Sequence, residues 1–275
     1  MSDVDFLVLD FDGGAMTTEC LASIDRQTMQ PANVIVFDNG SLNPSPRATH
    51  HSATNLGFAA GVNAAVRHAT SPYVALVNND VVLDDDWLAT VRGGMRDGVA
   101  AVQTILRRDD STIDGAGIDV SDGTIRQIGH GLPIGANLPP AWGVSATATL
   151  YRRELLHFDE SFFAYYEDVE LSARLREQGW ELLVLPVAKA THRGSQSASR
   201  LGSRARYLRT RNRYRVAKMH RGAGRVGALL AEDLRLLPRG RSSLRGIIAG
   251  LSQFILGVSG ANAEDLEPTK RRRTE

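Results

Sequence analysis

Carboxylate and amide side chains follow three apolar runs in the first third of the chain, each at a point where a strand would end. In chain order they are Asp10 and Asp12, then Asp38 and Asn39, then Asn78, Asn79 and Asp80. Oxygen atoms of these types are the hard ligands that divalent cations take in proteins. If the three runs are strands of one parallel sheet, their polar tips converge on one crevice, which is where such sheets bind ligands.

A pair of adjacent acids, Glu167 and Asp168, opens a predicted helix in the sequence YYEDVELSARLREQG, residues 165–179. Positioned carboxylates can accept or donate a proton during a reaction, and the charge of Glu167 tends to raise the pKa of its neighbour Asp168. Glu170 lies about 200° further around the helix, at roughly 100° per residue, so it faces elsewhere. A structural role stays open, because acids near a helix N-terminus also stabilise the helix dipole.

The tip of the first run, LDFDGG, has the Asp-x-Asp-Gly pattern in which haloacid-dehalogenase-like phosphatases present a nucleophilic aspartate. Such a phosphatase would also need a Ser or Thr at a strand end, a lysine, and an acidic pair that follows an apolar strand. Here the next strand ends in DNGS, and the later acidic pair opens a helix. The lysines are few, namely Lys189, Lys218 and Lys270. We therefore set the phosphatase interpretation aside.

Strand-like and helix-like patterns alternate from the N-terminus. Apolar runs predict strands at 5–11, 33–41 and 73–80, and amphipathic segments predict helices at 17–28, 55–69 and 84–95. Continuous apolar strands that alternate with helices are typical of an α/β protein with a mostly parallel central sheet and helices on both faces.

The second half of the chain has a more mixed pattern. The sequence predicts a hairpin over 118–129 that turns at Asp122-Gly123, and a strand leading into a short helix over 141–154. After the helix at 165–179 we expect a strand at 180–186, and from Ser203 onward the pattern is helical and basic.

Composition places the chain among ordinary soluble globular proteins, with 43% hydrophobic and 23% charged residues in a length of 275. The sole cysteine, Cys20, rules out an intrachain disulfide. The acidic start, MSDVD, lacks the pattern of a signal peptide. No apolar run reaches the roughly 20 residues that span a bilayer. The expected location is therefore the cytoplasm.

Arginine is abundant in the last third, although the whole chain is nearly neutral, with 32 Lys and Arg against 31 Asp and Glu. This asymmetry suits an anionic partner such as a diphosphate, a lipid phosphate or a membrane surface. No nucleic-acid-binding motif accompanies the arginines, so we expect no nucleic-acid partner. The apolar spacing of GIIAGLSQFILGV, residues 246–258, leaves two alternatives open: packing against the main domain, or peripheral contact with the inner face of a membrane.

Four segments resemble, in their order and spacing, the inverting glycosyltransferases of family 2. They are DNGS (38–41), NLGFAAGVN (55–63), LVNNDVVLDDDWL (76–88) and the stretch 158–180, which is followed by ATHRGS (190–195). The resemblance covers roughly residues 4–220 and is strongest to the branch of bacterial rhamnosyltransferases. It implies the GT-A fold, which binds nucleoside-diphosphate sugars.

The resemblance also implies a division of the chain. A GT-A catalytic domain would occupy 1–202, with a nucleotide-binding half at about 1–105 and an acceptor half at about 106–202. A basic helical extension would occupy 203–265, and a disordered basic tail 266–275.

The family's metal site maps onto the third strand tip and a later histidine. Asn78 occupies the first position of the family's Asp-x-Asp motif and Asp80 the position of the metal ligand. His192 lies where the family often places a metal-binding histidine. The resemblance therefore implies that Asp80 and His192 bind Mn²⁺ or Mg²⁺, with diphosphate oxygens completing the shell. A surface or capping role for His192 stays open.

The resemblance also implies contacts to the nucleotide part of the donor. Asp38 matches the position that contacts the base, and Asp10 lies at a strand tip where relatives usually have Asn-Tyr-Asn. The full set of expected donor-binding residues is Asp10, Asp38, Asn55, Gly57, Asn63, Asn78 and Asn79. Many relatives carry an arginine just before the asparagine at position 63, where this chain has Val62. This difference favours a dTDP-linked donor over a UDP-linked one. For the glycine-rich stretch, a plain helix start with small residues for packing is the alternative.

For the chemical step, the resemblance implies that Asp168 is the general base, with Glu167 beside it. A base that deprotonates the acceptor hydroxyl allows a single displacement with inversion. The expected reaction moves a hexose or deoxyhexose, such as rhamnose, to a glycan, lipid-linked or natural-product acceptor. The residues do not decide between a monomer and a homodimer.

The acceptor side is less specified. Trp142, Tyr165 and Tyr166 could stack on a sugar ring, or could belong to the core. Arg193 and Arg211 belong to a stretch that could close over the diphosphate, or could form a solvated basic helix.

Two rival functions stay open. One is a nucleotidyltransferase on a similar scaffold, which would want a lysine in a Gly- and Arg-rich loop after the first strand, where this chain has DFDGGAMTTE. The other is a catalytically degenerate protein that binds a nucleotide sugar without turnover, because Asn78 replaces an acid of the metal motif.

Overall fold

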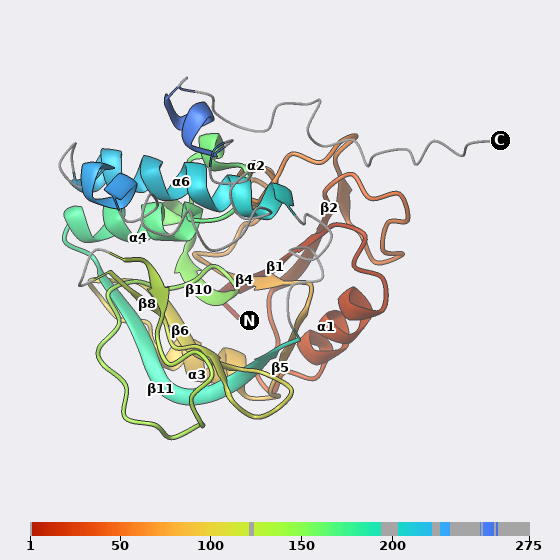
Figure 1. The fold of residues 1–275 in the computed structure, drawn as a ribbon. Helices are drawn as coiled ribbons and strands as arrows, with labels where there is room; N and C mark the ends of the chain where they lie inside the picture. Colours follow the sequence, from red (N-terminus) through yellow and green to blue (C-terminus); the bar gives the residue numbers. More distant parts are fainter. Residues whose placement is uncertain are drawn as a thin grey trace.

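A central β-sheet runs through the computed structural model, which describes residues 2–120, 124–193, 203–221, 226–231, 248, 250–255 and 257. In this part of the chain the sheet has nine strands in the order β3-β2-β1-β4-β10-β6-β11-β5, with β7 paired to β6 (Figure 1). The strands are β1 (Val4–Asp10), β2 (Asn33–Asp38), β3 (His50–His51), β4 (Tyr73–Asn78), β5 (Val81–Leu83), β6 (Val99–Arg107), β7 (Ile113–Gly115), β10 (Ala148–Arg152) and β11 (Glu181–His192). A small second sheet pairs β8 (Ile118–Asp119) with β9 (Arg126–Gln127).

The N-terminal half of the sheet is parallel. Strand β1 pairs in parallel with both β2 and β4, and the register sets Asp10 opposite Asp38 and Leu9 opposite Asn78. Five of the seven residues of β1 are hydrophobic, and nearly all of them are buried, as expected of a strand covered on both faces. The polar tips of β1, β2 and β4 therefore lie at one edge of the sheet, as the sequence predicted.

The C-terminal half is mixed in direction. Strand β10 runs antiparallel to both β4 and β6, whereas β11 is parallel to β6 and antiparallel to β5. The β11–β5 register sets His192 opposite Val81, the residue that follows Asp80. This pairing brings the end of β11 to the end of β4.

Helices cover both faces of the sheet. On one face, α1 (Ala15–Asp25) and α3 (Trp87–Gly94) pack against side chains of the central strands such as Phe6 and Val8. On the other face, α2 (Phe58–Val66) and α4 (Glu167–Glu177) pack against the alternate side chains, such as Leu7 and Leu76. This alternation confirms the predicted α/β layers.

A long helix, α6 (Ser203–Arg221), lies beside α4 on the outside of this layer (Figure 1). Two short 3-10 turns, η1 (Arg153–Leu155) and η2 (Glu160–Phe162), lie between β10 and α4. Residues Leu251 and Phe254 pack around Tyr214 of α6, which supports the packing alternative for that segment. No helix among the described residues is long and apolar enough to cross a membrane.

The expected elements appear near their predicted bounds, and the strand predicted at 180–186 continues as β11 to His192. The two strands of the predicted hairpin pair as β8 and β9, but its turn at Asp122-Gly123 lies outside the described residues, as do 194–202 and the predicted tail at 266–275. The sequence interpretation missed β6 and the short strands β3, β5 and β7. The division into domains stays a prediction.

Candidate active site

The carboxylate of Asp10 lies at the tip of β1 and is fully buried. Its Oδ1 accepts hydrogen bonds from Thr17 Oγ1 at 2.7 Å, Asn79 Nδ2 at 2.8 Å and the Gly13 amide at 3.2 Å. Its Oδ2 is buried without a hydrogen-bond partner among the described residues. Asp10 and Asn79 thus join the tips of β1 and β4, with one carboxylate oxygen left over.

The second acid of the β1 tip, Asp12, ties β1 to the loop after β2. Its Oδ1 accepts from the amides of Leu42 at 2.9 Å and Asn43 at 3.2 Å, and its own amide donates to Ser41 Oγ at 2.8 Å. Asp38, at the tip of β2, accepts from the Ser41 amide at 3.3 Å. These bonds order the loop beside Asp38, the residue that the family resemblance predicts to contact the nucleotide base.

Asn39 connects the β2 tip to the loop before α2. Its Nδ2 donates to Asn55 Oδ1 at 3.2 Å and to the Gly57 carbonyl at 3.0 Å, and its Oδ1 accepts from the Leu56 amide at 3.0 Å. Asn55 Oδ1 also accepts from the Gly57 amide at 2.8 Å. Asn55 and Gly57 therefore shape the loop between β3 and α2, and their contact with a nucleotide stays a prediction.

Gly57 has a left-handed backbone with φ of 84°, and it lies against Phe163. A Cβ at this position would come within 2.4 Å of the Phe163 ring and 2.6 Å of its carbonyl oxygen. Asn63, further along α2, accepts from the Phe158 amide at 2.9 Å and donates to the Phe158 carbonyl at 2.8 Å. These two residues dock α2 onto the segment before α4, which is the packing role that the sequence left open. Donor binding by Asn63 is not tested by these contacts.

The tip of β4 carries two further buried oxygen atoms without a hydrogen-bond partner in the described part of the chain. They are Asn78 Oδ1 and Asp80 Oδ1. The other carboxylate oxygen of Asp80, Oδ2, lies 3.3 Å from His192 Nε2. The predicted metal ligands Asp80 and His192 therefore face each other across the β5–β11 ladder.

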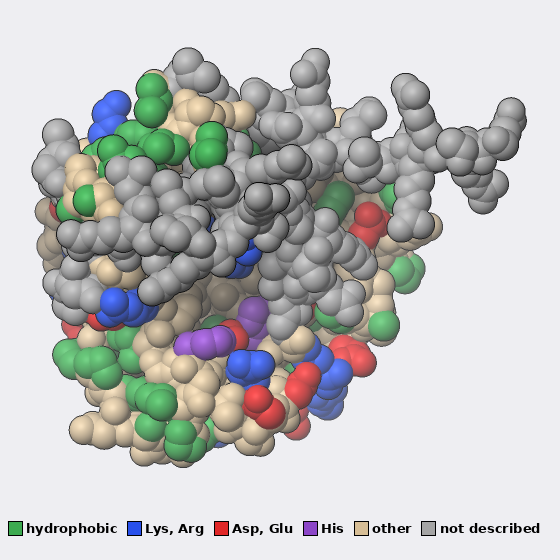
Figure 2. All heavy atoms as spheres, viewed as in Figure 1, with side chains coloured by type: hydrophobic (Ala, Val, Ile, Leu, Met, Phe, Trp, Pro, Cys, Tyr) green, Lys and Arg blue, Asp and Glu red, His purple; other side chains and the backbone are tan. Residues whose placement is uncertain are grey.

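The ring of His192 is held from its other side by Asp114 of β7, whose Oδ2 lies 2.7 Å from His192 Nδ1. Burial by itself lowers the pKa of His192, but the hydrogen bonds to Asp114 and Asp80 outweigh burial and raise the pKa to about 10. Sequence reasoning missed Asp114, because nothing in its neighbourhood marks it as a partner of a residue 78 positions later. Figure 2 shows histidine and acidic side chains gathered near the middle of this face, with Lys or Arg side chains beside them.

The donor set of this pair fits a divalent cation. A carboxylate with a free buried oxygen and an imidazole whose second nitrogen is bound by a carboxylate are the usual components of such sites. Within the described residues no three His, Cys, Asp or Glu side chains are grouped to hold a metal ion. Asp80 and His192 would therefore supply only part of a coordination shell, and cation binding would compete with the proton on His192.

Glu167 and Asp168 open α4, as predicted. Glu167 is buried, and its Oε2 has no partner among the described residues. Burial raises the pKa of Asp168, and burial together with the charge of Asp168 raises the pKa of Glu167. Such shifted carboxyls are common at sites that move protons. Asp168 itself is half-buried, whereas Glu167 is buried.

A short piece of backbone before β10 links Asp168 to the β4 tip. The amide of Ala146 donates to Asp168 Oδ2 at 3.4 Å, and the next carbonyl, that of Thr147, accepts from the Asn78 amide at 2.8 Å. The Ser145 amide is fixed in turn by Gln103 Oε1 at 2.8 Å. The Glu167–Asp168 pair and the β4 tip therefore border the same segment.

The two arginines expected near the diphosphate have different surroundings. Arg193 is 43% exposed, pairs with Glu19 at 2.8 Å, and donates its amide to the Asp80 carbonyl at 3.0 Å. Arg211 is fully buried and donates to the Phe162 carbonyl at 2.9 Å. The expected solvated position is wrong for Arg211, because its guanidinium is buried and bonded inside the protein. A part for this stretch in closing over the diphosphate stays a prediction.

The aromatic residues expected on the acceptor side are divided between core and surface. Trp142 and Tyr166 pack against the cluster formed by Ile118, Phe162 and Val169. The ring of Tyr165 is covered by the guanidinium of Arg209, which lies 4.5 Å from its centroid. Trp142 and Tyr166 thus pack at the edge of the core, and stacking on a sugar ring stays a prediction.

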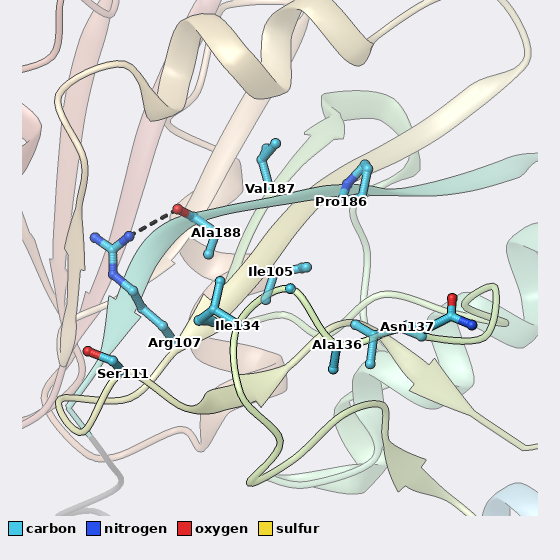
Figure 3. Close-up of a pocket in the computed structure, with 11 residues that line it drawn as sticks. Ile105, Arg107, Ser111, Ile134, Ala136, Asn137, Pro186, Val187 and Ala188 are labelled. Carbon is cyan, nitrogen blue, oxygen red and sulfur yellow. Dashed lines mark hydrogen bonds between the residues drawn. The ribbon is translucent and has the colours of Figure 1, made fainter.

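A wide hollow of about 950 Å³ lies on the outer side of β6 and β11 (Figure 3). Apolar side chains such as Ile105, Ile134 and Val187 line it, and Arg107 closes one end. Arg107 donates to the Ala188 carbonyl at 3.0 Å and to Thr191 Oγ1 at 2.9 Å. The lining residues include none of the site residues predicted from the sequence. The hollow therefore borders β11 and is no part of the predicted site.

The chain is similar in sequence and in fold to known glycosyltransferases. Residues 11–158 match the model of the family described as glycosyl transferase family 2. The chain belongs to this family. Its membership confirms the predicted family resemblance and leaves the nucleotidyltransferase alternative without support.

Curated relatives extend the comparison past the matched segment. The chain is 24% identical over 253 residues to the N-acetylglucosaminyl-diphospho-decaprenol L-rhamnosyltransferase of Mycobacterium tuberculosis strain H37Rv, covering 73% of this chain and 79% of the relative. The protein of the same name from strain CDC 1551 / Oshkosh matches to the same extent. This family 2 glycosyltransferase therefore falls in the rhamnosyltransferase-like branch.

Solved structures share its GT-A fold. The TarS fragment 1–349 from S. aureus in complex with UDP-GlcNAc aligns with a TM-score of 0.60 at 16% identity, covering 93% of this chain and 81% of that one. The mannosyltransferase PcManGT from Pyrobaculum calidifontis, in complex with GDP-Man and Mn²⁺, aligns with a TM-score of 0.57 at 15% identity, covering 93% and 87%. The predicted fold class is thus confirmed for this glycosyltransferase.

Proposed function

We propose that this glycosyltransferase is a metal-dependent inverting enzyme that takes its sugar from a nucleoside-diphosphate donor. The observation that carries the proposal is the Asp80–His192 pair at the end of β4, with Asp80 Oδ1 unpaired among the described residues and His192 oriented by Asp114. The Mn²⁺ and GDP-Man of the mannosyltransferase and the UDP-GlcNAc of TarS are consistent with a donor of this chemistry.

In this proposal the tips of β1, β2 and β4 bind the donor. Asp38 contacts the base, and Asn78 and Asn79 lie near the diphosphate. A bound Mn²⁺ or Mg²⁺, held by Asp80 and His192, would offset the negative charge of the departing nucleoside diphosphate. Three hydrogen-bond donors on Asp10 Oδ1 offset part of the negative charge that this carboxylate would present to the diphosphate.

Asp168 is the proposed general base. It accepts the proton of the acceptor hydroxyl while the acceptor oxygen forms a bond to the anomeric carbon of the donor sugar. The bond from that carbon to the diphosphate oxygen breaks on the opposite face, and its electron pair leaves with the diphosphate. The raised pKa of Asp168 makes it a better proton acceptor than an ordinary aspartate once it is ionised. Glu167, the buried neighbour of Asp168, is not itself the proposed base.

The transferred sugar is a hexose or deoxyhexose, and the similarity to two L-rhamnosyltransferases favours rhamnose from a dTDP- or UDP-linked donor. Those relatives are named for a diphospho-decaprenol acceptor, so we favour a lipid-linked acceptor over a free glycan or a natural product. Such an acceptor would bring the protein to the inner face of the cytoplasmic membrane, and the arginine-rich C-terminal third suits anionic headgroups.

The test is calorimetric titration of the full chain with dTDP, UDP, GDP and CDP, each with and without Mn²⁺. We expect dTDP or UDP to bind with a requirement for Mn²⁺, and we expect Asp80→Asn to lose that requirement together with most of the affinity. A radiolabelled donor of the preferred nucleotide, incubated with membrane lipid extract, then tests transfer. Nucleotide binding without turnover would favour the catalytically degenerate alternative, and no binding of any nucleotide would overturn the proposal.

A further inference from the structure

The loop that leads into the Glu167–Asp168 pair has an unusual backbone. Phe163, Tyr165 and Tyr166 all have positive φ values, of 63°, 70° and 70°. Such values are costly for residues with bulky side chains and persist only where the surroundings impose them. Tyr166 is also the N-cap residue of α4, directly before its first residue Glu167. The conformation of this loop therefore sets where α4 begins and where Asp168 lies.

Two adjacent side chains of α6 hold this loop. Asn212 Nδ2 lies 2.9 Å from the Phe162 carbonyl, 2.8 Å from the Ala164 carbonyl and 2.8 Å from the Tyr165 carbonyl. Arg211 Nη2 donates to the Phe162 carbonyl at 2.9 Å, and Arg211 Nε donates to Asn212 Oδ1 at 2.9 Å. This last bond fixes the orientation of the amide, so that its NH₂ group faces the three carbonyls.

Burial makes these contacts informative. Arg211 and Asn212 are both fully buried. Placing a guanidinium and an amide inside a protein is unfavourable unless their hydrogen bonds are made. Here both side chains donate to carbonyls of the loop. The carbonyl oxygens converge because the backbone turns tightly, and without donors between them they would repel one another. The buried pair thus stabilises a loop conformation that the residues of the loop do not favour by themselves.

The opposite side of the loop is held by α2. The Phe163 carbonyl accepts hydrogen bonds from the amides of Phe58 at 2.6 Å and Ala59 at 3.2 Å, in the first turn of that helix. Gly57 leaves room for the Phe163 ring. The loop is therefore fixed between a helix of the N-terminal half and a helix of the C-terminal extension.

We propose that Asn212 and Arg211 are positioning residues for the transfer reaction: they hold the loop 161–166 so that Asp168 is presented to the acceptor. The inference rests on the proposed role of Asp168 as the base. It gives α6 a part in the chemical step, whereas the sequence predicted for this segment only contact with an anion or with solvent. Both residues act through the loop and touch no reacting atom.

The experiment compares Asn212→Asp with the wild type and with Thr210→Val as a control. Aspartate has the size of asparagine but presents oxygen atoms to the three carbonyls in place of the NH₂ group. Thr210 is a buried neighbour on α6 whose hydroxyl donates to the Arg206 carbonyl of the same helix, at 3.0 Å, and to no loop carbonyl among the described residues. For each protein the kcat of sugar transfer, the Kd of the nucleotide with Mn²⁺, and the amide hydrogen exchange of peptides covering 158–171 are measured.

We expect Asn212→Asp to lower kcat by about 100-fold, which is the usual effect of a displacement of about 1 Å at a reacting centre. Its nucleotide Kd should stay within about twofold of the wild type, and exchange should rise in the loop peptides but not in β1 or β2. Thr210→Val should match the wild type. If Asn212→Asp does not fold, Arg211→Lys takes its place, because lysine cannot make both bonds of the guanidinium; a smaller loss of kcat is then expected.

Unchanged exchange in the loop together with an unchanged kcat would overturn the inference, as would a loss of nucleotide affinity equal to the loss of kcat. A wild-type protein that transfers no sugar would instead count against the proposed function. The exchange measurement would still decide whether Asn212 holds the loop.

Discussion

The ring of His192 lies between two carboxylates, with Nδ1 at 2.7 Å from Asp114 and Nε2 at 3.3 Å from Asp80. A carboxylate on one nitrogen fixes the ring and makes the other nitrogen a better metal ligand. Asp114 thus acts on the proposed metal site without binding the metal.

Asp114→Asn should raise the Kd for Mn²⁺, measured in the presence of the preferred nucleotide, by about 10-fold. The amide keeps the size of the side chain but removes the charge that holds the imidazole. Asp110→Asn is the matched control, since Asp110 is an exposed acid of the neighbouring turn that accepts hydrogen bonds from Thr112 and lies 3.9 Å from Arg108 Nε. An Mn²⁺ affinity that is unchanged in Asp114→Asn would contradict this role.

Glu167 gives a prediction about pH and stability. Because burial raises its pKa, the folded protein keeps a proton on Glu167 at pH values where an unfolded chain has lost it. The folded state is therefore destabilised as the pH rises from the ordinary range of a glutamate through the raised pKa of Glu167. Glu167→Gln removes this pH-dependent loss of stability, because glutamine does not ionise.

The thermal midpoint of Glu167→Gln relative to the wild type should accordingly increase between pH 5 and pH 9. One pKa unit corresponds to about 1.4 kcal/mol, and each 1 kcal/mol is worth about 2–4 °C in a protein of similar size. Glu154→Gln, at an exposed position, should show no such trend. If the difference in thermal midpoint between Glu167→Gln and the wild type stayed constant across this range, ionisation of Glu167 would not destabilise the folded protein.

At the level of the elements, the sequence predicted what depends on local pattern. The sequence predicted β1, β2 and β4 correctly because strands buried on both faces are continuous apolar runs. It also predicted the polar residues at their ends, which lie together because the three strands are parallel neighbours. Strand β6 was missed, although all of its residues except Arg107 are buried. The antiparallel direction of β10 depends on neighbours distant in the chain, and β3 and β7 exist only through pairing with longer strands.

The same distinction applies to the site. Asp80, His192, Glu167 and Asp168 could be placed from spacing and resemblance. The role of Asn212 could not, because its partners lie 47 to 50 residues away and their backbone conformation is not encoded in a motif. The one local signal was an asparagine in the interior of a helix, a position that asparagine does not favour.

The contact between α2 and the loop before α4 depends on Gly57, which precedes α2. Gly57→Ala should destabilise the protein by about 1–3 kcal/mol, since the residue has a positive φ and its new methyl group would meet Phe163. Gly93→Ala is the control: Gly93 lies in helix α3 with nothing near its Cβ, so this change should stabilise by about 0.5–1 kcal/mol. Chemical denaturation of both variants measures the difference. Equal stability of the two variants would mean that α2 does not depend on this contact.

At the scale of the whole molecule, the site is assembled from segments far apart in the chain. The β4 tip supplies Asp80, β7 supplies Asp114, the end of β11 supplies His192, and α4 supplies Asp168. The sheet order places β4 and β10 at its centre, where the parallel and mixed halves meet. The donor and the acceptor would therefore approach from the two halves and meet at this junction.

In the proposed reaction, Asp168 deprotonates the acceptor while the strand tips hold the donor. The most direct measurement is the rate of sugar transfer by the wild type and by Asp168→Asn, with the Kd of nucleotide and Mn²⁺ determined on the same preparations. Asp168→Asn should lose about 10²- to 10⁴-fold in kcat, as expected for removal of a general base, while the nucleotide Kd should change by less than about twofold. Sugar transfer at the wild-type rate, or a loss of nucleotide affinity in proportion to the loss of rate, would show that Asp168 is not the base.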